Sequence, residues 1–225
     1  MTKGRNRDRF IPALRFDRLT PLYDSLLRWT LREATFKRKL VEQAHIEKCC
    51  RVLDLGCGTA TLTILIKRSH PDAEVVGLDG DAEALEIAKV KTVRAGVQVG
   101  LDHGMCFDLP YPDDSFDRVL SSLLFHHLSR ENKLRTLREV FRVLRPGGEL
   151  HIADWGTPGN AFLRGAFLLV QLLDGFETTA DNVDGVLPGL CTAAGFEEVQ
   201  ELGHHHTGFG TIRFIDARKP MPKNE

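Results

Sequence analysis

Two carboxylates and two glycines, placed along two apolar runs, are the residues of this chain best suited to binding a ligand. The run Arg51–Leu55 contains Asp54 and leads into Gly56-Cys57-Gly58-Thr59, and a second apolar run ends in Asp79. Glycines let the backbone approach a ligand closely, and an acid at the end of the next strand can accept hydrogen bonds from both ribose hydroxyls. This order of residues predicts a site for a nucleotide-like molecule.

The details of the pattern disfavour a dinucleotide. The third glycine of a G-x-G-x-x-G pattern would fall at Thr61, and Asp54 stands two residues before the first glycine, where its charge would repel a pyrophosphate. The same carboxylate suits a ligand with an ammonium or sulfonium group. S-adenosylmethionine (SAM) has both groups, so the pattern favours SAM over NAD, and an NAD-dependent oxidoreductase is the less favoured alternative.

Candidate catalytic residues follow two later apolar runs. His126 and His127 come after the predicted fourth strand, and an imidazole titrates near neutral pH, so either can be a general base. The alternative is that one histidine bonds the backbone and the other packs in the interior. Asp154 and Trp155 end the predicted fifth strand and are expected to border the cleft, where Asp154 either positions a substrate or caps the next turn.

Other polar clusters raise the question of a metal. The first and third residues of His204-His205-His206 would share a face of a strand, but no cysteine or acid stands at ligand spacing beside them. The acids within residues 113–117 lie in a turn before a strand, for which solvation is the simpler interpretation. We therefore predict no metal site.

Composition limits the class of protein. The chain has 225 residues, of which 42% are hydrophobic, and a net charge of −1, which gives no general attraction for nucleic acid. Five cysteines, an odd number, predict no disulfide framework and a reducing cytoplasm. The most apolar stretch, residues 162–173, is too short to span a bilayer. A small-molecule partner fits best, and the oligomeric state is open.

Strand-like and helix-like runs alternate from residue 51 onward. Asp81 and Ser129 are good N-caps for two of the helices. Repeated β-α-β units imply a mostly parallel sheet covered on both faces, and the short last connection implies an antiparallel final strand. The predicted strands are residues 51–55, 74–79, 97–101, 116–124, 149–153, 198–202 and 211–217, and the predicted helices are 60–69, 82–94, 130–144, 162–173 and 186–194.

The domain organisation is simple. Residues 1–15 are predicted to be a flexible basic tail, and 220–225 a second tail. Helical spacing of apolar residues predicts N-terminal helices over 16–46 that cover the region after them. No linker-like stretch interrupts the chain, so we expect one domain over 16–219.

Four segments in order carry a resemblance to a known family. They are Val52-Leu-Asp-Leu-Gly-Cys-Gly-Thr59, Val76-Gly-Leu-Asp79, the run from Asp108 to Leu128, and Leu144-Arg-Pro-Gly-Gly148. With these segments the chain resembles the class I SAM-dependent methyltransferases, especially the small-molecule branch that includes the ubiquinone and menaquinone biosynthesis type. The resemblance covers about residues 21 to 214.

The resemblance implies an α/β, Rossmann-like, doubly wound sheet of seven mostly parallel strands, with an antiparallel last strand and an N-terminal helical cap. SAM would lie across the carboxyl ends of the first, second and fourth strands. It also implies roles for particular residues: Asp54, Gly56, Cys57, Gly58 and Thr59 along the methionine, Asp79 and Gly80 at the ribose, Met105 and Cys106 at the adenine, and Ser122 near the methionine end. Tyr23 either closes over the cofactor, beside the substrate, or packs within the N-terminal helix.

One segment departs from the family. Many relatives have Gly-Asp-Ala where this chain has Gly104-Met105-Cys106, so the acid that would accept from the adenine amino group is absent. Met105 can still pack on the ring face as a polarizable surface. Asp108, three residues later, either replaces the missing acid or caps a turn.

By this resemblance, the chain would transfer a methyl group from SAM to an O, N or C centre of a small molecule, including a lipophilic one. The cofactor is already activated, so the protein mainly places the acceptor in line with the methyl group. The segment 162–173 either lines a pocket for such an acceptor or is an ordinary packed helix. The rivals are a non-catalytic SAM-binding regulator and a nucleic-acid methyltransferase, and the charge gives the second no support.

Overall fold

The computed structural model describes residues 33–157, 181–208 and 210–222. Tyr23, the basic tail, the first part of the N-terminal helices and the apolar segment 162–173 lie outside the described residues. Within the part that is described, no helix is long and apolar enough to cross a membrane.

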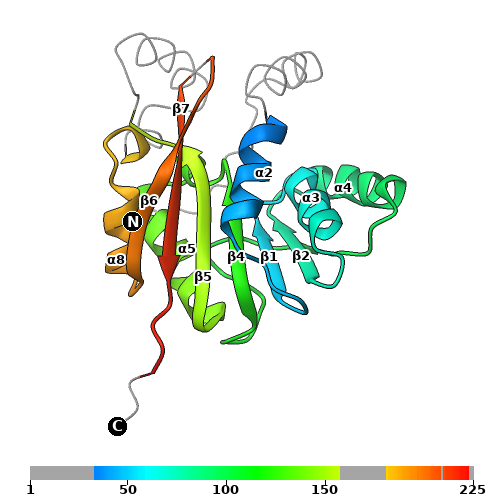
Figure 1. Cartoon of the computed structure of the whole chain (residues 1–225), viewed down its shortest axis with the longest axis horizontal. Coiled ribbons are helices and arrows are strands. Elements are labelled where there is room, and N and C mark those ends of the chain that lie inside the picture. The colour runs from blue at the N-terminus through cyan, green and yellow to red at the C-terminus, as the bar shows by residue number, and fades with distance from the viewer. Residues whose placement is uncertain (1–32, 158–180, 209, 223–225) are drawn as a thin grey trace, which may run out of the picture.

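A seven-stranded sheet forms the centre of the molecule (Figure 1). Its spatial order is β3-β2-β1-β4-β5-β7-β6, and only β7 runs antiparallel to its neighbours. The predicted doubly wound sheet with an antiparallel last strand is therefore confirmed. The strands are β1 (Arg51–Leu55), β2 (Glu74–Asp79), β3 (Gly100–His103), β4 (Phe116–Ser122), β5 (Leu144–Trp155), β6 (Glu197–His206) and β7 (Thr211–Arg218).

The strand order reverses next to β1. From β1 the chain moves outward to β2 and β3 on one side and later returns to add β4 and β5 on the other. These five strands are parallel, so their carboxyl ends lie at one edge of the sheet. In sheets of this kind, ligands bind at that edge where the order reverses.

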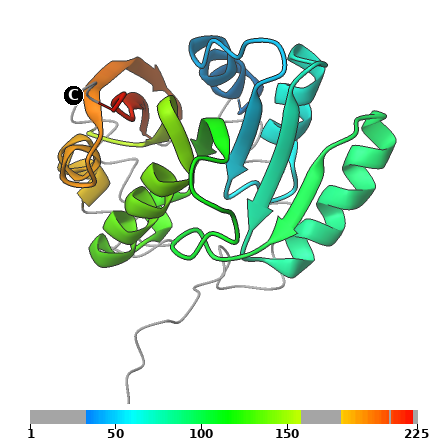
Figure 2. The ribbon, with the colours of Figure 1, turned by 90° about the horizontal axis from the view of Figure 1, so that it is seen from below.

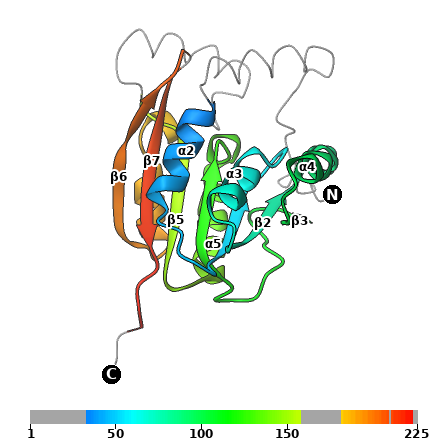
Figure 3. The same cartoon turned by 45° about the vertical axis from the view of Figure 1, so that its right-hand side comes forward.

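Helices cover both faces of the sheet (Figures 2 and 3). One face carries α2 (Glu33–Gln43), α3 (Thr61–Ser69) and α4 (Ala82–Ala95), and the other carries α5 (Arg130–Val143) and α8 (Leu187–Ala193). Each face has its own apolar core, because successive strand residues point to opposite faces. Fully buried residues include Leu40, Leu62 and Ile66 of the first set of helices and Leu137, Val140 and Cys191 of the second.

The predicted N-caps are confirmed. The Asp81 side chain accepts from the backbone N–H groups of Glu83 and Ala84, and the Ser129 side chain accepts from Asn132 N–H. Each cap satisfies donors that the first helical turn leaves without a partner, and such a cap stabilises a helix by about 1 kcal/mol.

The third and fourth strands differ from their predicted ranges. The predicted strand 97–101 is observed as β3 at Gly100–His103, because α4 continues to Ala95 and Gly96 ends it in a left-handed conformation. Residues 97–99 then connect α4 to β3, which pairs with β2 from Gly100 onward. β4 stops at Ser122 because Leu123 has φ +56° and donates its N–H to Ala153 O at 2.9 Å.

The fifth strand begins earlier than predicted. β5 starts at Leu144, although Pro146-Gly147-Gly148 was expected to separate helix and strand. The pairing with β4 shifts at this point, since Leu144 lies opposite Phe116 and Glu149 lies opposite Arg118. A bulge therefore accommodates the proline and glycines within the strand.

A buried histidine joins β5 to β7. His151 is 2% exposed, and its Nδ1 lies 2.8 Å from Asp216 Oδ1 while its Nε2 lies 3.4 Å from Glu149 Oε2. Burial by itself lowers the pKa of His151, but the two carboxylates outweigh it and the pKa is raised. Arg118 and Arg218 also pair with Glu149. Because Glu149 already pairs with two arginines, we interpret the cluster as an ion-pair network and not as a metal site.

The His151 network predicts pH-dependent stability. The folded pKa is raised above the unfolded value of about 6.5, so the stabilisation is complete below that pH and is lost as pH rises through the folded pKa. His151→Gln should lower the free energy of unfolding by about 1–3 kcal/mol at pH 6 and by less at pH 9. Urea denaturation at both pH values measures this difference.

The matched control is His70→Gln, since His70 is partly exposed. It should change stability by no more than about 0.5 kcal/mol at either pH. If His151→Gln lowers the free energy of unfolding equally at pH 6 and pH 9, the claim that His151 is buried as an imidazolium is contradicted.

Candidate functional site

The turn after β1 is held by backbone contacts with β2. Gly56 and Cys57 both donate their N–H groups to Leu78 O, at 2.9 and 3.0 Å. Gly56 has φ +73°, and a Cβ there would lie 2.9 Å from a methyl carbon of Leu124. Glycine is therefore required at this position by conformation and by space. The turn has the tight backbone that the sequence predicted for a ligand-binding loop.

Asp79 lies where that turn meets the end of β2. Its Oδ2 accepts from Gly58 N–H at 2.7 Å, and its Oδ1 accepts from Asp81 N–H at 2.9 Å. Burial raises the pKa of Asp79, and these backbone donors offset part of the rise. The carboxyl is partly exposed at the carboxyl edge of the sheet, so it remains able to accept from a ligand.

Asp54 lies beneath the same turn and is fully buried. Its Oδ2 accepts from Thr63 Oγ1 at 2.6 Å, while its Oδ1 finds no hydrogen-bond partner in the part of the chain that the structure describes. Burial raises the pKa of Asp54 to about 6. A buried carboxylate oxygen without a donor is costly, and a cationic ligand would relieve that cost.

The structure adds residues to this site that sequence reasoning missed. Thr63 from α3 binds Asp54, and the positive charge of Lys37 from α2 offsets part of the pKa rise. Gly77 of β2 makes room for the turn, because a Cβ there would lie 2.9 Å from Cys57 Sγ. No local pattern marked these positions, since each depends on which elements become neighbours in space.

The predicted adenine-binding segment follows β3. Met105 is partly buried and forms an isolated bridge with Asp108, whose side chain is exposed. Cys106 is buried, and its Sγ accepts from Thr136 Oγ1 of α5 at 3.4 Å. Asp108 therefore shares a turn with Met105. This position is compatible with both expectations for Asp108, which are binding the adenine amino group and capping a turn.

Asp154 is the centre of a buried polar cluster at the same edge. It is 1% exposed, and it accepts from Phe125 N–H at 2.7 Å, Trp155 N–H at 2.7 Å and Asn182 Nδ2 at 3.3 Å. The Nδ1 of His126 lies 2.7 Å from Asp154 Oδ1. This burial argues against direct contact between Asp154 and a substrate, and instead Asp154 holds the turn after β4 in place.

His126 and His127 differ in environment. Their ring centroids are 3.9 Å apart, and His126 is buried whereas His127 is partly buried. Burial, followed by the charge of His126, lowers the pKa of His127 to about 3. A group with that pKa is a weak base at neutral pH, which argues against proton transfer by His127.

Two other expected residues lie near this cluster. Ser122, the last residue of β4, is buried at the carboxyl edge of the sheet. Trp155 is 5% exposed and packs in the core on the α2 face, so little of its surface faces outward. Asn182, which bonds both Asp154 and Trp155 O, also belongs to the cluster, and no sequence pattern marked it.

The consecutive histidines lie on β6, which extends to His206. His204 and His206 are both exposed, with ring centroids 4.5 Å apart, and His206 Nδ1 lies 3.2 Å from Thr211 Oγ1. They share a face, as the strand period predicts.

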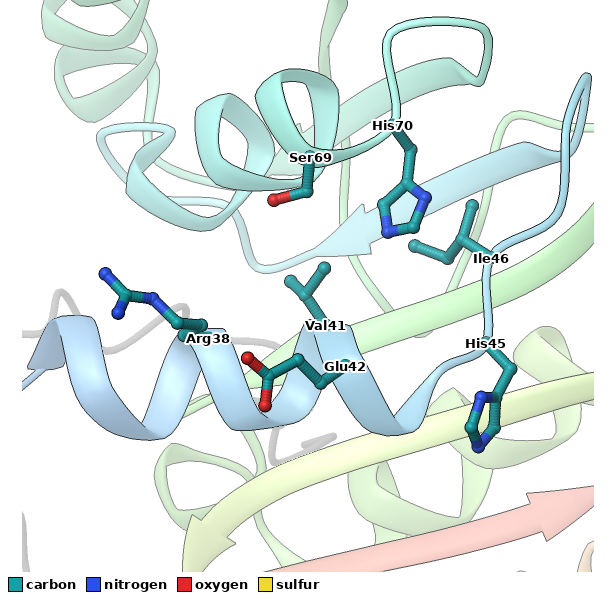
Figure 4. Close-up of a pocket in the computed structure, with 7 residues that line it drawn as sticks. All are labelled: Arg38, Val41, Glu42, His45, Ile46, Ser69 and His70. Atoms are coloured by element: carbon teal, nitrogen blue, oxygen red, sulfur yellow. The ribbon is translucent and has the colours of Figure 1, made fainter.

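A separate groove of about 570 Å³ lies between α2 and α3 (Figure 4). Val41, Ile46 and His70 approach one another in it, while Arg38 and Glu42 lie along α2. It lies beside the end of α3 that leads into β2, so it is at the opposite edge of the sheet from the glycine turn.

Comparisons of the sequence with known proteins agree with this geometry. The family described as "Methyltransferase domain" matches residues 52–148. A demethylmenaquinone methyltransferase from Thermus thermophilus is 34% identical over 176 residues, which cover 77% of this chain and 77% of that protein. One from Listeria monocytogenes is 32% identical over 148 residues, which cover 64% of this chain but only 61% of the relative's length.

The fold also has solved counterparts. The crystal structure of a SAM-dependent methyltransferase from Aquifex aeolicus has a TM-score of 0.66 and 20% sequence identity, covering 88% of this chain and 95% of that one. At this identity the likeness concerns the fold alone. Together with the Thermus relative, the glycine turn and its two acids assign the family: the chain belongs to the class I SAM-dependent methyltransferases, in the menaquinone-biosynthesis-like branch.

Proposed function

We propose that the protein transfers a methyl group from SAM to an O, N or C centre of a small molecule. The observation that carries this proposal is the pair of acids at neighbouring strand ends, of which Asp54 has a buried oxygen without a donor. Asp54 and Asp79 lie on either side of the glycine turn, at the point where the strand order reverses. That arrangement fits a ligand with a positive charge at one end and ribose hydroxyls at the other.

The residues present fit SAM. Asp54 would balance its positive charge, the backbone of Gly56 to Thr59 would lie along the methionine, and Asp79 with Gly80 would hold the ribose. Met105 and Cys106 would flank the adenine, and Ser122 would lie near the methionine end. SAM supplies a methyl group already activated on sulfur, so the protein's task is to orient the acceptor and exclude water.

His126 is the residue we propose for moving a proton from the acceptor. Asp154 is ionised, since its interaction with His126 and two backbone donors overcome burial and lower its pKa. It therefore accepts from His126 Nδ1 and fixes the orientation of that ring. Asp154 is then a positioning residue, and His127 is a neutral neighbour of the site.

The acceptor is proposed from the relatives. Both curated relatives named above are demethylmenaquinone methyltransferases, so a demethylmenaquinone-type quinol is the first acceptor to assay, and a lipophilic small molecule is the expected class. The cysteines are all free thiols, which supports a reducing cytoplasm as the location. A SAM-binding protein without catalysis is the second candidate, because a cofactor site does not certify turnover.

The proposal is tested by methyl transfer from labelled SAM. The wild-type protein should label a fraction of a small-molecule extract or a demethylmenaquinone-type quinol. Asp79→Ala should not, because the ribose contacts are lost. If the wild-type protein binds SAM but labels no acceptor, the catalytic proposal is wrong and the regulatory candidate replaces it.

Binding of SAM should depend on pH through Asp54. The pKa of Asp54 in the free protein is about 6, and a cationic ligand needs this carboxyl group ionised. Below that pH, Asp54 must therefore lose a proton when SAM binds. Calorimetry should show SAM binding about tenfold more weakly at pH 5 than at pH 7.

Asp54→Asn is the matched variant, since it keeps the shape and cannot ionise. It should bind SAM more weakly at pH 7 and lose most of the dependence on pH. A variant that keeps the wild-type pH profile would show that another group titrates, and Asp79→Asn would then identify or exclude the second acid.

The role of His126 is tested once an acceptor is known. His126→Gln should lower kcat by about 10²-fold or more while S-adenosylhomocysteine affinity changes by less than about twofold. His127→Gln should have a much smaller effect, because that imidazole is a weak base. If His126→Gln keeps kcat within about threefold, the contact between His126 and Asp154 has only a structural role.

A further inference from the structure

Lys91 reaches from α4 to the glycine turn. Its Nζ donates to Thr59 Oγ1 at 2.9 Å and to Thr61 Oγ1 at 2.8 Å. Thr59 belongs to the turn, and Thr61 is the first residue of α3. One side chain therefore joins three parts of the chain that meet at the cofactor edge of the sheet.

Several residues of the turn have a left-handed backbone conformation. Gly56, Gly58 and Ala60 all have positive φ, and for Ala60 this conformation is strained because it has a Cβ. Ala60 is also the N-cap of α3, and no side chain caps that helix. The hydroxyls of Thr59 and Thr61, on either side of this N-cap, both accept from Lys91. A contact from the neighbouring helix α4 thus lies at the start of α3.

The contact with Thr61 brings the positive charge of Lys91 close to the start of α3. A cation beside a helix N-terminus is unfavourable, because the helix dipole is positive at that end. The turn that Lys91 contacts through Thr59 is also bonded to the acid Asp79, through Gly58 N–H. The carboxylate of a bound amino-acid ligand would add a second negative group.

We propose that Lys91 is a positioning residue of the cofactor site, which holds the glycine turn in its binding conformation through Thr59 and Thr61. This inference rests on the proposed function. When the contact is lost, the turn is free to relax its left-handed residues, and Gly58 N–H then loses its fixed place on Asp79. The site loses affinity for the cofactor although no ligand contact has been removed.

The test is calorimetric titration with S-adenosylhomocysteine. Lys91→Met should raise the Kd about tenfold, and Lys91→Arg, which keeps the charge and the donors, should recover part of the affinity. Lys89→Met is the matched control, because Lys89 lies on the same helix and pairs with Glu86 at the surface. It should change the Kd by less than about twofold.

A double-mutant cycle tests whether Lys91 acts through its contact with Thr61. Thr61→Val removes one acceptor and should weaken binding, and the Lys91→Met/Thr61→Val variant should bind no more weakly than Lys91→Met alone. Thermal melting without ligand confirms that the variants fold, and the rise in Tm on adding S-adenosylhomocysteine should be smaller in Lys91→Met than in Lys89→Met.

Two results would overturn the inference. One is an unchanged Kd in Lys91→Met, and the other is additive losses in the double variant. A wild-type protein that does not bind S-adenosylhomocysteine would instead remove the proposed function, so the two failures can be told apart.

Discussion

The hydrogen bond from the Gly58 amide to the Asp79 carboxylate, 2.7 Å long, is the contact on which the site depends. It joins the turn after β1 to the end of β2, while the parallel pairing of the two strands places both acids near the same edge of the sheet. Both acids are desolvated enough for their pKa values to be raised. Holding two acids out of water is costly unless a ligand supplies a positive charge and hydrogen-bond donors. The geometry thus selects for a ligand with both properties.

The same edge of the sheet carries a second buried polar cluster around Asp154. Asp154 bonds the turn after β4, while Leu123 N–H bonds Ala153 O of β5, so β4 and β5 are tied together beyond their regular pairing. The ends of β1 and β2 thus border the side proposed for the cofactor, and the ends of β4 and β5 border the side proposed for the acceptor. Methyl transfer by placement needs both sides to be rigid relative to each other, and the parallel sheet provides that.

Much of this arrangement could be predicted from local patterns. Gly56, Asp54 and Asp79 stand at the ends of apolar runs, and parallel strands bring such ends to one edge. Asp81 and Ser129 marked two helix starts because capping is a local interaction. The sequence did not predict that Asp154 is buried or that Thr63, Asn182 and Lys91 take part, because these contacts join residues distant in the chain. Strand ends also shifted where pairing with a neighbour overrode the local pattern, as at β5.

The most direct measurement of the central claim is a crystal structure with S-adenosylhomocysteine bound. The account predicts that the ribose hydroxyls contact Asp79, that the sulfur lies beside the turn from Gly56 to Gly58, and that the homocysteine ammonium is the group nearest to Asp54. Density for the ligand at another edge of the sheet, or a ligand at this edge with its ribose away from Asp79, would contradict the account.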